Sequence, residues 1–375
     1  MTFRRTWAVA RKEFHTIMRS TSTLVLVLLS PFMLLVMMAY AFTVDIQHVP
    51  IAVLDHDRSS MSRVFTTQIT AGDDIDLFVQ ADSMEEIEEL FLRGKIKAAV
   101  VIHPSFASDL LSLKGISLQI IIDGTEPASG GFAVDHIGWR TEEFVDSILA
   151  EQMRSLNIDT LTPIDLRVRS WYNPGLKPRV DLIPGLISMV LGFPALSVAL
   201  ALAKEREHGT LEQLMVTPIG RFELLVGKMI PYIVVGLVNV IFLPLFSMVW
   251  FHVPFNGSFL LYVLLSILFL FAILSMGILL GGFIPTQAAA MALSFMVIFF
   301  PGFFLTGIFF PLVSMPEMVR LEGLGMPGTH YAIICRGVIV TGVGLDVLWP
   351  YGVALLMLGV AFTVIAALFF RKKLG

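Results

Sequence analysis

Six long apolar runs divide the chain, and a longer segment of different pattern separates the first run from the second. The runs cover residues 23–44, 182–203, 229–251, 259–283, 288–313 and 347–370. A helix of about 20 apolar residues crosses the hydrocarbon core of a bilayer. With 56% of all residues hydrophobic, an ordinary soluble protein is excluded. The pattern predicts a polytopic α-helical membrane protein with six transmembrane helices.

Residues 45–181 have the pattern of an inserted α/β domain between the first and second spans. Apolar runs at 50–55, 75–80, 96–103 and 116–123 predict strands, and amphipathic stretches at 59–69, 83–94 and 104–113 predict helices between them. A longer helix over roughly 128–157 leads back to the second span. The segment carries 22 Asp and Glu against 12 Lys and Arg, a net charge of −10, whereas the rest of the chain carries +6.

Two further segments are neither spans nor free loops. Residues 1–22 alternate basic and apolar positions, as an amphipathic helix on the cytoplasmic membrane surface does. A signal peptide is the competing interpretation, but no small-residue cleavage site follows the run at 23–44, in which Pro31 predicts a kink. Prolines and glycines break the apolar stretch 314–346 into short pieces, so we expect broken helices on the outer face, packed against protein.

The distribution of basic residues predicts the orientation of the spans. The N-terminal segment, the stretch 202–228 and the C-terminal end hold five, four and three Lys and Arg, and the opposite short loops hold few. Under the positive-inside rule, both termini are cytoplasmic and the acidic α/β domain is extracytoplasmic.

The predicted spans contain no Asp, Glu, Lys, Arg or His, and Asn239 is their most polar residue. Ion-driven carriers need ionisable groups inside the membrane, so a self-powered secondary carrier is disfavoured. The string from Gly220 to Lys228 is not a phosphate-binding loop, because six residues separate its glycines and Met229 follows the lysine. The single cysteine, Cys335, excludes a disulfide framework or a cysteine metal cluster. Any energy for transport therefore has to enter from another chain.

A polar stretch between the second and third spans is the candidate entry point. Residues 205–216 are mostly good helix formers, and Pro218 and Gly220 end the pattern. We expect a cytoplasmic coupling helix within 204–220 that receives force from a soluble partner. The alternative is a solvated loop whose charges only enforce the topology.

This stretch resembles a motif of the type-2 ABC exporter permeases, E-R-E-x-G-T-x-E-x-L-x-x-T-P. The matching residues are Glu205, Arg206, Glu207, Gly209, Thr210, Glu212, Leu214, Thr217 and Pro218. The resemblance covers nearly the whole chain, including the large first loop of the bacterial multidrug-efflux members. It implies a dimer of permeases, with itself or a sister chain, that carries two ATP-binding subunits. ATP and Mg would bind to those subunits, and no cofactor is expected on this chain.

Several other residues are candidates for function. Arg11, Lys12, Glu13 and Phe14 could contact the ATPase, although a lipid-anchoring helix explains them equally well. A substrate pathway could include Asn239, Phe300, Phe303, Phe304 and Thr306, although packing or lipid contact is the more common role for such residues. Arg336 is expected to pair with Glu317 or Glu322. Gly277, Gly281 and Gly282 are expected to permit close helix packing.

The sequence thus predicts the non-enzymatic membrane subunit of an ATP-driven exporter in the bacterial inner membrane. Expected partners are an ATP-binding subunit, a second permease and membrane lipid, with a periplasmic adaptor as a further candidate, but not nucleic acid. The alternative is a receptor or anchor whose extracytoplasmic domain binds a partner without transport.

Overall fold

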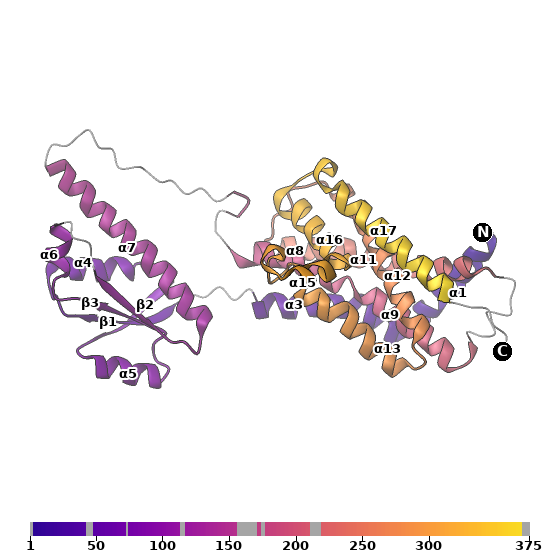
Figure 1. The fold of residues 1–375 in the computed structure, drawn as a ribbon, viewed down its shortest axis with the longest axis horizontal. Helices are drawn as coiled ribbons and strands as arrows, with labels where there is room; N and C mark the ends of the chain where they lie inside the picture. Colours follow the sequence, from indigo (N-terminus) through magenta and orange to yellow (C-terminus); the bar gives the residue numbers. More distant parts are fainter. Residues whose placement is uncertain are drawn as a thin grey trace. The chain divides into compact units, whose positions relative to one another are not determined.

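The computed structural model describes residues 3–42, 48–72, 74–112, 117–155, 171–173, 177–210 and 219–369, with backbone only at 127–128 and 151–155. The chain forms two compact units. One comprises residues 45–168, and the other comprises residues 1–44 together with 169–375. Figure 1 shows the elements of each unit.

The unit 45–168 is built on a four-stranded sheet with strand order β2-β1-β3-β4. Strands β1 (Val49–Asp55), β2 (Ile75–Ala81) and β3 (Ala98–Ile102) are parallel, and β4 (Leu118–Ile122) runs antiparallel to β3. Helices α4 (Ser60–Ile69), α6 (Phe106–Leu111) and α7 (Pro127–Ser155) cover one face, and α5 (Met84–Leu92) covers the other (Figure 1). The central strands β1 and β3 are buried on both faces, which explains their continuous apolar sequence. All four predicted strands and the four helices are confirmed within a few residues.

Among its described residues, the second unit contains six helical segments long and apolar enough to span a membrane. The first is α2 (Thr21–Leu24), η1 (Val25–Leu29) and α3 (Ser30–Phe42), and the second is α8 (Pro178–Val190) with α9 (Phe193–Glu207). The third and fourth are α11 (Arg221–Trp250) and α12 (Phe259–Phe283). The fifth is α13 (Gln287–Ser294), η2 (Phe295–Phe299) and α14 (Phe300–Phe304), and the sixth is α17 (Leu345–Phe369). The prediction of a polytopic helical membrane protein is confirmed.

Shorter elements complete this unit. Helix α1 (Phe3–Arg19) precedes the first span, as predicted. Between the fifth and sixth spans lie η3 (Leu312–Ser314), α15 (Glu317–Leu324), α16 (Pro327–Arg336) and η4 (Gly337–Thr341). These are the broken helices expected over 314–346.

Three predicted boundaries are wrong, each for a local reason. The fifth span ends at Phe304 rather than at 313, because the backbone turns at Gly307, whose φ is +79°. The third span begins at Arg221 rather than at 229, because the Gly220 N–H donates to Glu223 (2.9 Å) and starts the helix there. Glu223 and Lys228 therefore lie inside α11, although the predicted span 229–251 itself contains no charged residue. The predicted polar helix over 205–216 does not begin at Glu205, because α9 continues through Glu207 and stops at Gly209 (φ +70°).

The fourth span packs tightly against the second through small residues. A Cβ added to Gly277 would lie 2.4 Å from the carbonyl oxygen of Ala195, and one added to Gly281 would lie 2.7 Å from the Cα of Ala199. Such close backbone approach is typical of helix pairs in membranes, where van der Waals contact drives association. The prediction of close packing is confirmed for these two glycines.

Candidate functional site: a buried charge cluster

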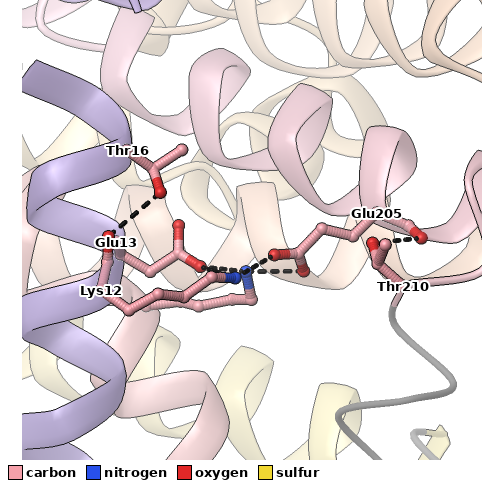
Figure 2. Close-up of polar contacts among 6 residues, drawn as sticks. Lys12, Glu13, Thr16, Glu205 and Thr210 are labelled. Carbon is pink, nitrogen blue, oxygen red and sulfur yellow. Dashed lines mark hydrogen bonds and ion pairs between the residues drawn. The ribbon is translucent and has the colours of Figure 1, made fainter. Parts of the chain in front are cut away.

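Four charged side chains from three elements meet at one end of the helical unit. The ammonium of Lys228, on α11, lies 2.8 Å from Oε1 of Glu13 on α1 and 2.7 Å from Oε2 of Glu205 on α9. The Lys12 ammonium lies 3.3 Å from Glu13 and 3.0 Å from Glu205. Figure 2 shows the Glu13 and Glu205 carboxylates directed toward each other, with the ammonium groups between them. The cluster therefore joins the N-terminal helix to the second and third spans.

The cluster is buried and contains two positive and two negative charges. The side chains of Lys228 and Glu13 are 1% and 4% exposed, Glu205 is 16% exposed, and Lys12 is 51% exposed. An unpaired charge at such a position would cost several kcal/mol, so burial requires that each charge find a partner. The arrangement makes each of the three elements dependent on the other two.

Helix α1 is held against α11 by a stripe of residues spaced three or four apart. Its buried positions are Thr6, Val9, Ala10, Glu13 and Ile17. Val9 packs directly on Gly227, where an added Cβ would lie 2.8 Å from the Cβ of Val9. This contact brings the α1 backbone close enough for Glu13 to reach Lys228, the next residue of α11.

The pKa values on α1 reflect this environment. Burial alone would raise the pKa of the Glu13 carboxyl, but the charges and hydrogen bonds of Lys228 and Lys12 outweigh burial and lower it below 4.5. Burial would likewise lower the pKa of Lys12, but Glu13 and Glu205 outweigh it and raise the pKa above 10.5. Both groups are therefore charged at neutral pH.

The last turn of α9 also ties to the connection between the fourth and fifth spans. Arg206 donates to the carbonyl of Gly282 (2.6 Å). The Glu207 carboxylate accepts from the backbone N–H (3.1 Å) and the side-chain amide (3.0 Å) of Gln287, the first residue of α13. A carboxylate at a helix N-terminus interacts favourably with the helix dipole. Displacement of the end of α9 would therefore be transmitted to α11 through Lys228 and to α13 through Glu207.

The predicted coupling residues fall into three groups. Glu205, Arg206, Glu207, Gly209 and Thr210 are described, and Thr210 donates to the carbonyl of Glu205 (3.1 Å). Glu212, Leu214, Thr217 and Pro218 lie outside the described residues. Arg11 and Phe14 lie on the exposed side of α1, whereas Glu13 faces the bundle. In this structure the Glu13 and Glu205 carboxylates bind lysines of the same chain. The role of these residues in contacting an ATPase stays a prediction.

Lys12 was a candidate contact for the ATPase and Lys228 a charge of the polar stretch, but the sequence did not predict that both would pair with Glu13 and Glu205. Lys228 was assigned to a polar connection because the third span was taken to begin at Met229. The available signal was the dipeptide Gly227–Lys228 within a helical apolar pattern, since a small residue beside a buried lysine permits close approach of another helix.

Three of the predicted pathway residues lie together, since the ring centroids are 4.9 Å apart both in the pair Phe300–Phe304 and in the pair Phe303–Phe304. Asn239 is buried and donates to the carbonyl of Val27 (2.5 Å), four residues before Pro31, which has no N–H to offer that carbonyl. The π-helical turn Val25–Leu29 sits directly before Pro31, at the predicted kink. The Phe303 ring stacks on Phe309, and the remaining phenylalanines, Phe300 and Phe304, are exposed. Asn239 therefore has a structural partner, and Thr306 lines a cavity.

That cavity is small and lies within the helical unit. Its volume is about 20 Å³, and it is lined mainly by the second, fourth and fifth spans and by the start of α16. A space of this size holds about one water molecule. The cavity in this structure is therefore too small to hold a drug-sized molecule.

Arg336 also has a different partner from the expected one. Its guanidinium pairs with Asp181 on α8 (Nε to Oδ1, 3.0 Å) rather than with Glu317 or Glu322. The reason is the order of the helices in space, because α16 packs against α8.

Comparison with known proteins identifies the family. Residues 20–370 match the model described as ABC-2 family transporter protein. The chain is 29% identical to the "Probable multidrug ABC transporter permease YbhS" of Escherichia coli strain K12, over 91% of this chain and 90% of that protein. It is 24% identical to the "Probable multidrug ABC transporter permease YbhR" over 99% of both chains. It is 31% identical to the "Inner membrane transport permease YhhJ" over 87% of this chain and 86% of that protein. YbhR and YhhJ are also from Escherichia coli strain K12.

The family model matches residues 20–370, so the match includes the six apolar helices and the E-R-E-x-G-T residues. The chain therefore belongs to the ABC-2 family of transporter proteins, in which it is a membrane-spanning permease.

Proposed function

We propose that this permease is the membrane subunit of an exporter driven by ATP that a separate subunit hydrolyses. The observation that carries the proposal is the buried charge cluster, which fastens α1 and the end of α9 to α11. Elements coupled in this way can pass a displacement at their cytoplasmic ends to several spans at once. The relatives' names support a multidrug-type cargo and an inner-membrane location.

The proposal includes an orientation and an assembly. Basic residues at both ends and in the connection after α9 support cytoplasmic termini, with the acidic α/β unit on the outer side. Two permeases, identical or sister chains, would carry two ATP-binding subunits. ATP and Mg would bind to those subunits and not to this chain.

Co-purification followed by reconstitution tests this proposal. The chain is isolated from mild detergent with its attached proteins and then placed in vesicles. ATP hydrolysis and uptake of an apolar dye are measured in inside-out vesicles. We expect an ATP-binding subunit to co-purify and dye uptake to require ATP.

The coupling role is tested by charge reversal. Glu207→Lys removes the acceptor of Gln287 and should leave ATP hydrolysis measurable while transport falls. The matched control is Glu88→Lys, an exposed position on α5. Unchanged transport in Glu207→Lys vesicles would contradict the coupling role. Labelling of a cysteine at position 207 from the outer side would contradict the orientation, and cargo movement without any ATPase would refute the proposal as a whole.

A further inference from the structure

The Arg336 side chain holds together three elements that are far apart in the sequence. Besides the pair with Asp181, its Nη1 donates to the carbonyl of Gly307 (2.8 Å) and its Nη2 donates to the carbonyl of Ile308 (3.1 Å). Nη2 also lies 3.3 Å from the second carboxylate oxygen of Asp181. Arg336 ends α16, Asp181 lies in the first turn of α8, and Gly307 and Ile308 follow the fifth span. A planar guanidinium is suited to this role, because its donors point in several fixed directions.

The segment after α14 depends on these contacts for its position. Residues 305–311 do not form a regular helix, and Gly307 adopts a φ of +79°. Ile308 is 4% exposed and packs against Gly185 of α8, where an added Cβ would lie 3.1 Å from its side chain. The Arg336 guanidinium, the Ile308 side chain and the Phe309 ring, which packs on Phe303 and Phe42, thus fix a segment without a regular backbone hydrogen-bond ladder. Such a segment can be released more cheaply than a helix.

The same three elements form walls of the cavity. Thr306, adjacent to Gly307, lines it from the end of the fifth span, and Ser188 and Met189 line it from α8. Met326, Pro327 and Gly328 line it at the start of α16. At about 20 Å³ the cavity is far below the roughly 300 Å³ or more that ligand pockets occupy. A cargo could enter only if these elements move apart. The flexible methionines of the cavity wall suit an apolar cargo of variable shape.

We propose that Arg336 and Asp181 are positioning residues that keep this route closed and that must separate during each transport cycle. This proposal rests on the proposed export function. Neither Arg336 nor Asp181 is among the residues that line the cavity, so the role of the pair is to control access. The side chain of Arg336 is 24% exposed, so water can replace its partners when the pair separates.

The first test measures opening of the cavity in the purified chain, without ATP or cargo. Thr306→Cys places a thiol in the cavity wall, and its labelling rate reports opening. The parent chain, with the buried Cys335 as its only cysteine, gives the background. Asp181→Asn and Arg336→Gln should each raise the labelling rate about tenfold or more. Arg336→Lys, which keeps the positive charge but not the planar set of guanidinium donors, should raise it less. The matched control is Glu322→Gln, an exposed acid on the neighbouring α15, which should leave the rate unchanged.

The second test measures coupling in the reconstituted transporter. Asp181→Asn should raise ATP hydrolysis in the absence of cargo and lower the cargo moved per ATP, and Glu322→Gln should do neither. The closing role would be overturned if Asp181→Asn and Arg336→Gln, each combined with Thr306→Cys, were labelled within twofold of the rate of Thr306→Cys alone. Faster labelling with an unchanged ratio of cargo to ATP would overturn the role in transport. Failure of the proposed function itself would appear differently, as no ATP-dependent transport by the parent chain.

Discussion

Replacement of Lys228 by methionine should release α1 from the bundle. Methionine keeps a similar length and apolar stem but removes the ammonium that lies 2.8 Å from Glu13 and 2.7 Å from Glu205. Two buried carboxylates then face each other with only Lys12 between them. Because Lys12 carries a single positive charge, it can neutralise only one of these carboxylates, and its half-exposed position weakens that interaction by solvent screening.

The magnitude follows from burial. Removal of one partner from a buried ion pair costs about 3–5 kcal/mol. Since Lys12 already reaches both carboxylates, at 3.3 and 3.0 Å, we expect the lower end of that range. A cost of about 3 kcal/mol corresponds to a roughly 150-fold change in the equilibrium between docked and released α1.

Thiol labelling of Val9→Cys measures this equilibrium. Val9 is buried against Gly227, so a cysteine of nearly the same size reacts only when α1 leaves α11. The labelling rate should rise roughly 150-fold with Lys228→Met. The control Lys12→Met removes a half-exposed lysine, worth about 1 kcal/mol or less, and should raise the rate no more than about fivefold.

The double variant Glu13→Gln/Lys228→Met provides a second check, because it removes a negative charge together with the positive one. Its labelling rate should fall back toward that of the parent. The reasoning is refuted if Lys228→Met labels no faster than Lys12→Met, because the buried pair would then not hold α1 in place.

Two further predictions concern the titration of Glu13 and the close packing at Gly277. Because the pKa of Glu13 is lowered, its stabilising contribution is present above about pH 4.5 and is lost as the pH falls through the folded pKa. The pKa of Lys12 is raised, so the stabilising contribution of Lys12 is lost only above about pH 10.5. Hydrogen exchange across α1, corrected for its intrinsic pH dependence, should therefore accelerate below pH 4.5 in the parent but not in Glu13→Gln, and equal slopes in both would contradict the assignment. Gly277→Ala should cost about 1–3 kcal/mol and lower the unfolding midpoint in detergent, because its Cβ would lie 2.4 Å from the Ala195 oxygen. Gly302→Ala, whose Cβ would meet nothing within 4 Å, should not lower it, and equal midpoints in the two variants would disprove the steric argument.

Periodicity and length were sufficient to predict the elements. Strands β1 and β3 are continuous apolar runs because both of their faces are buried, and the spans are long apolar runs because lipid or protein surrounds every side. These patterns depend on the environment of each segment and not on its neighbours. The E-R-E-x-G-T residues likewise indicated the family from a local motif.

The partners of charged residues required the tertiary structure. Local composition placed Lys228 in a polar connection, but the helix that begins at Arg221 carries it inside the bundle, where α1 and α9 supply its carboxylates. Arg336 has acidic residues nearby in sequence, yet it pairs with Asp181, 155 positions away. The attraction between two charges weakens with distance, so an ion pair forms only between side chains that the fold brings close together. Helix packing decides which charges meet, and it depends on the shapes of many side chains at once. The sequence therefore determined the kind of protein and its elements, and the packing of the helices decided which residues form its candidate sites.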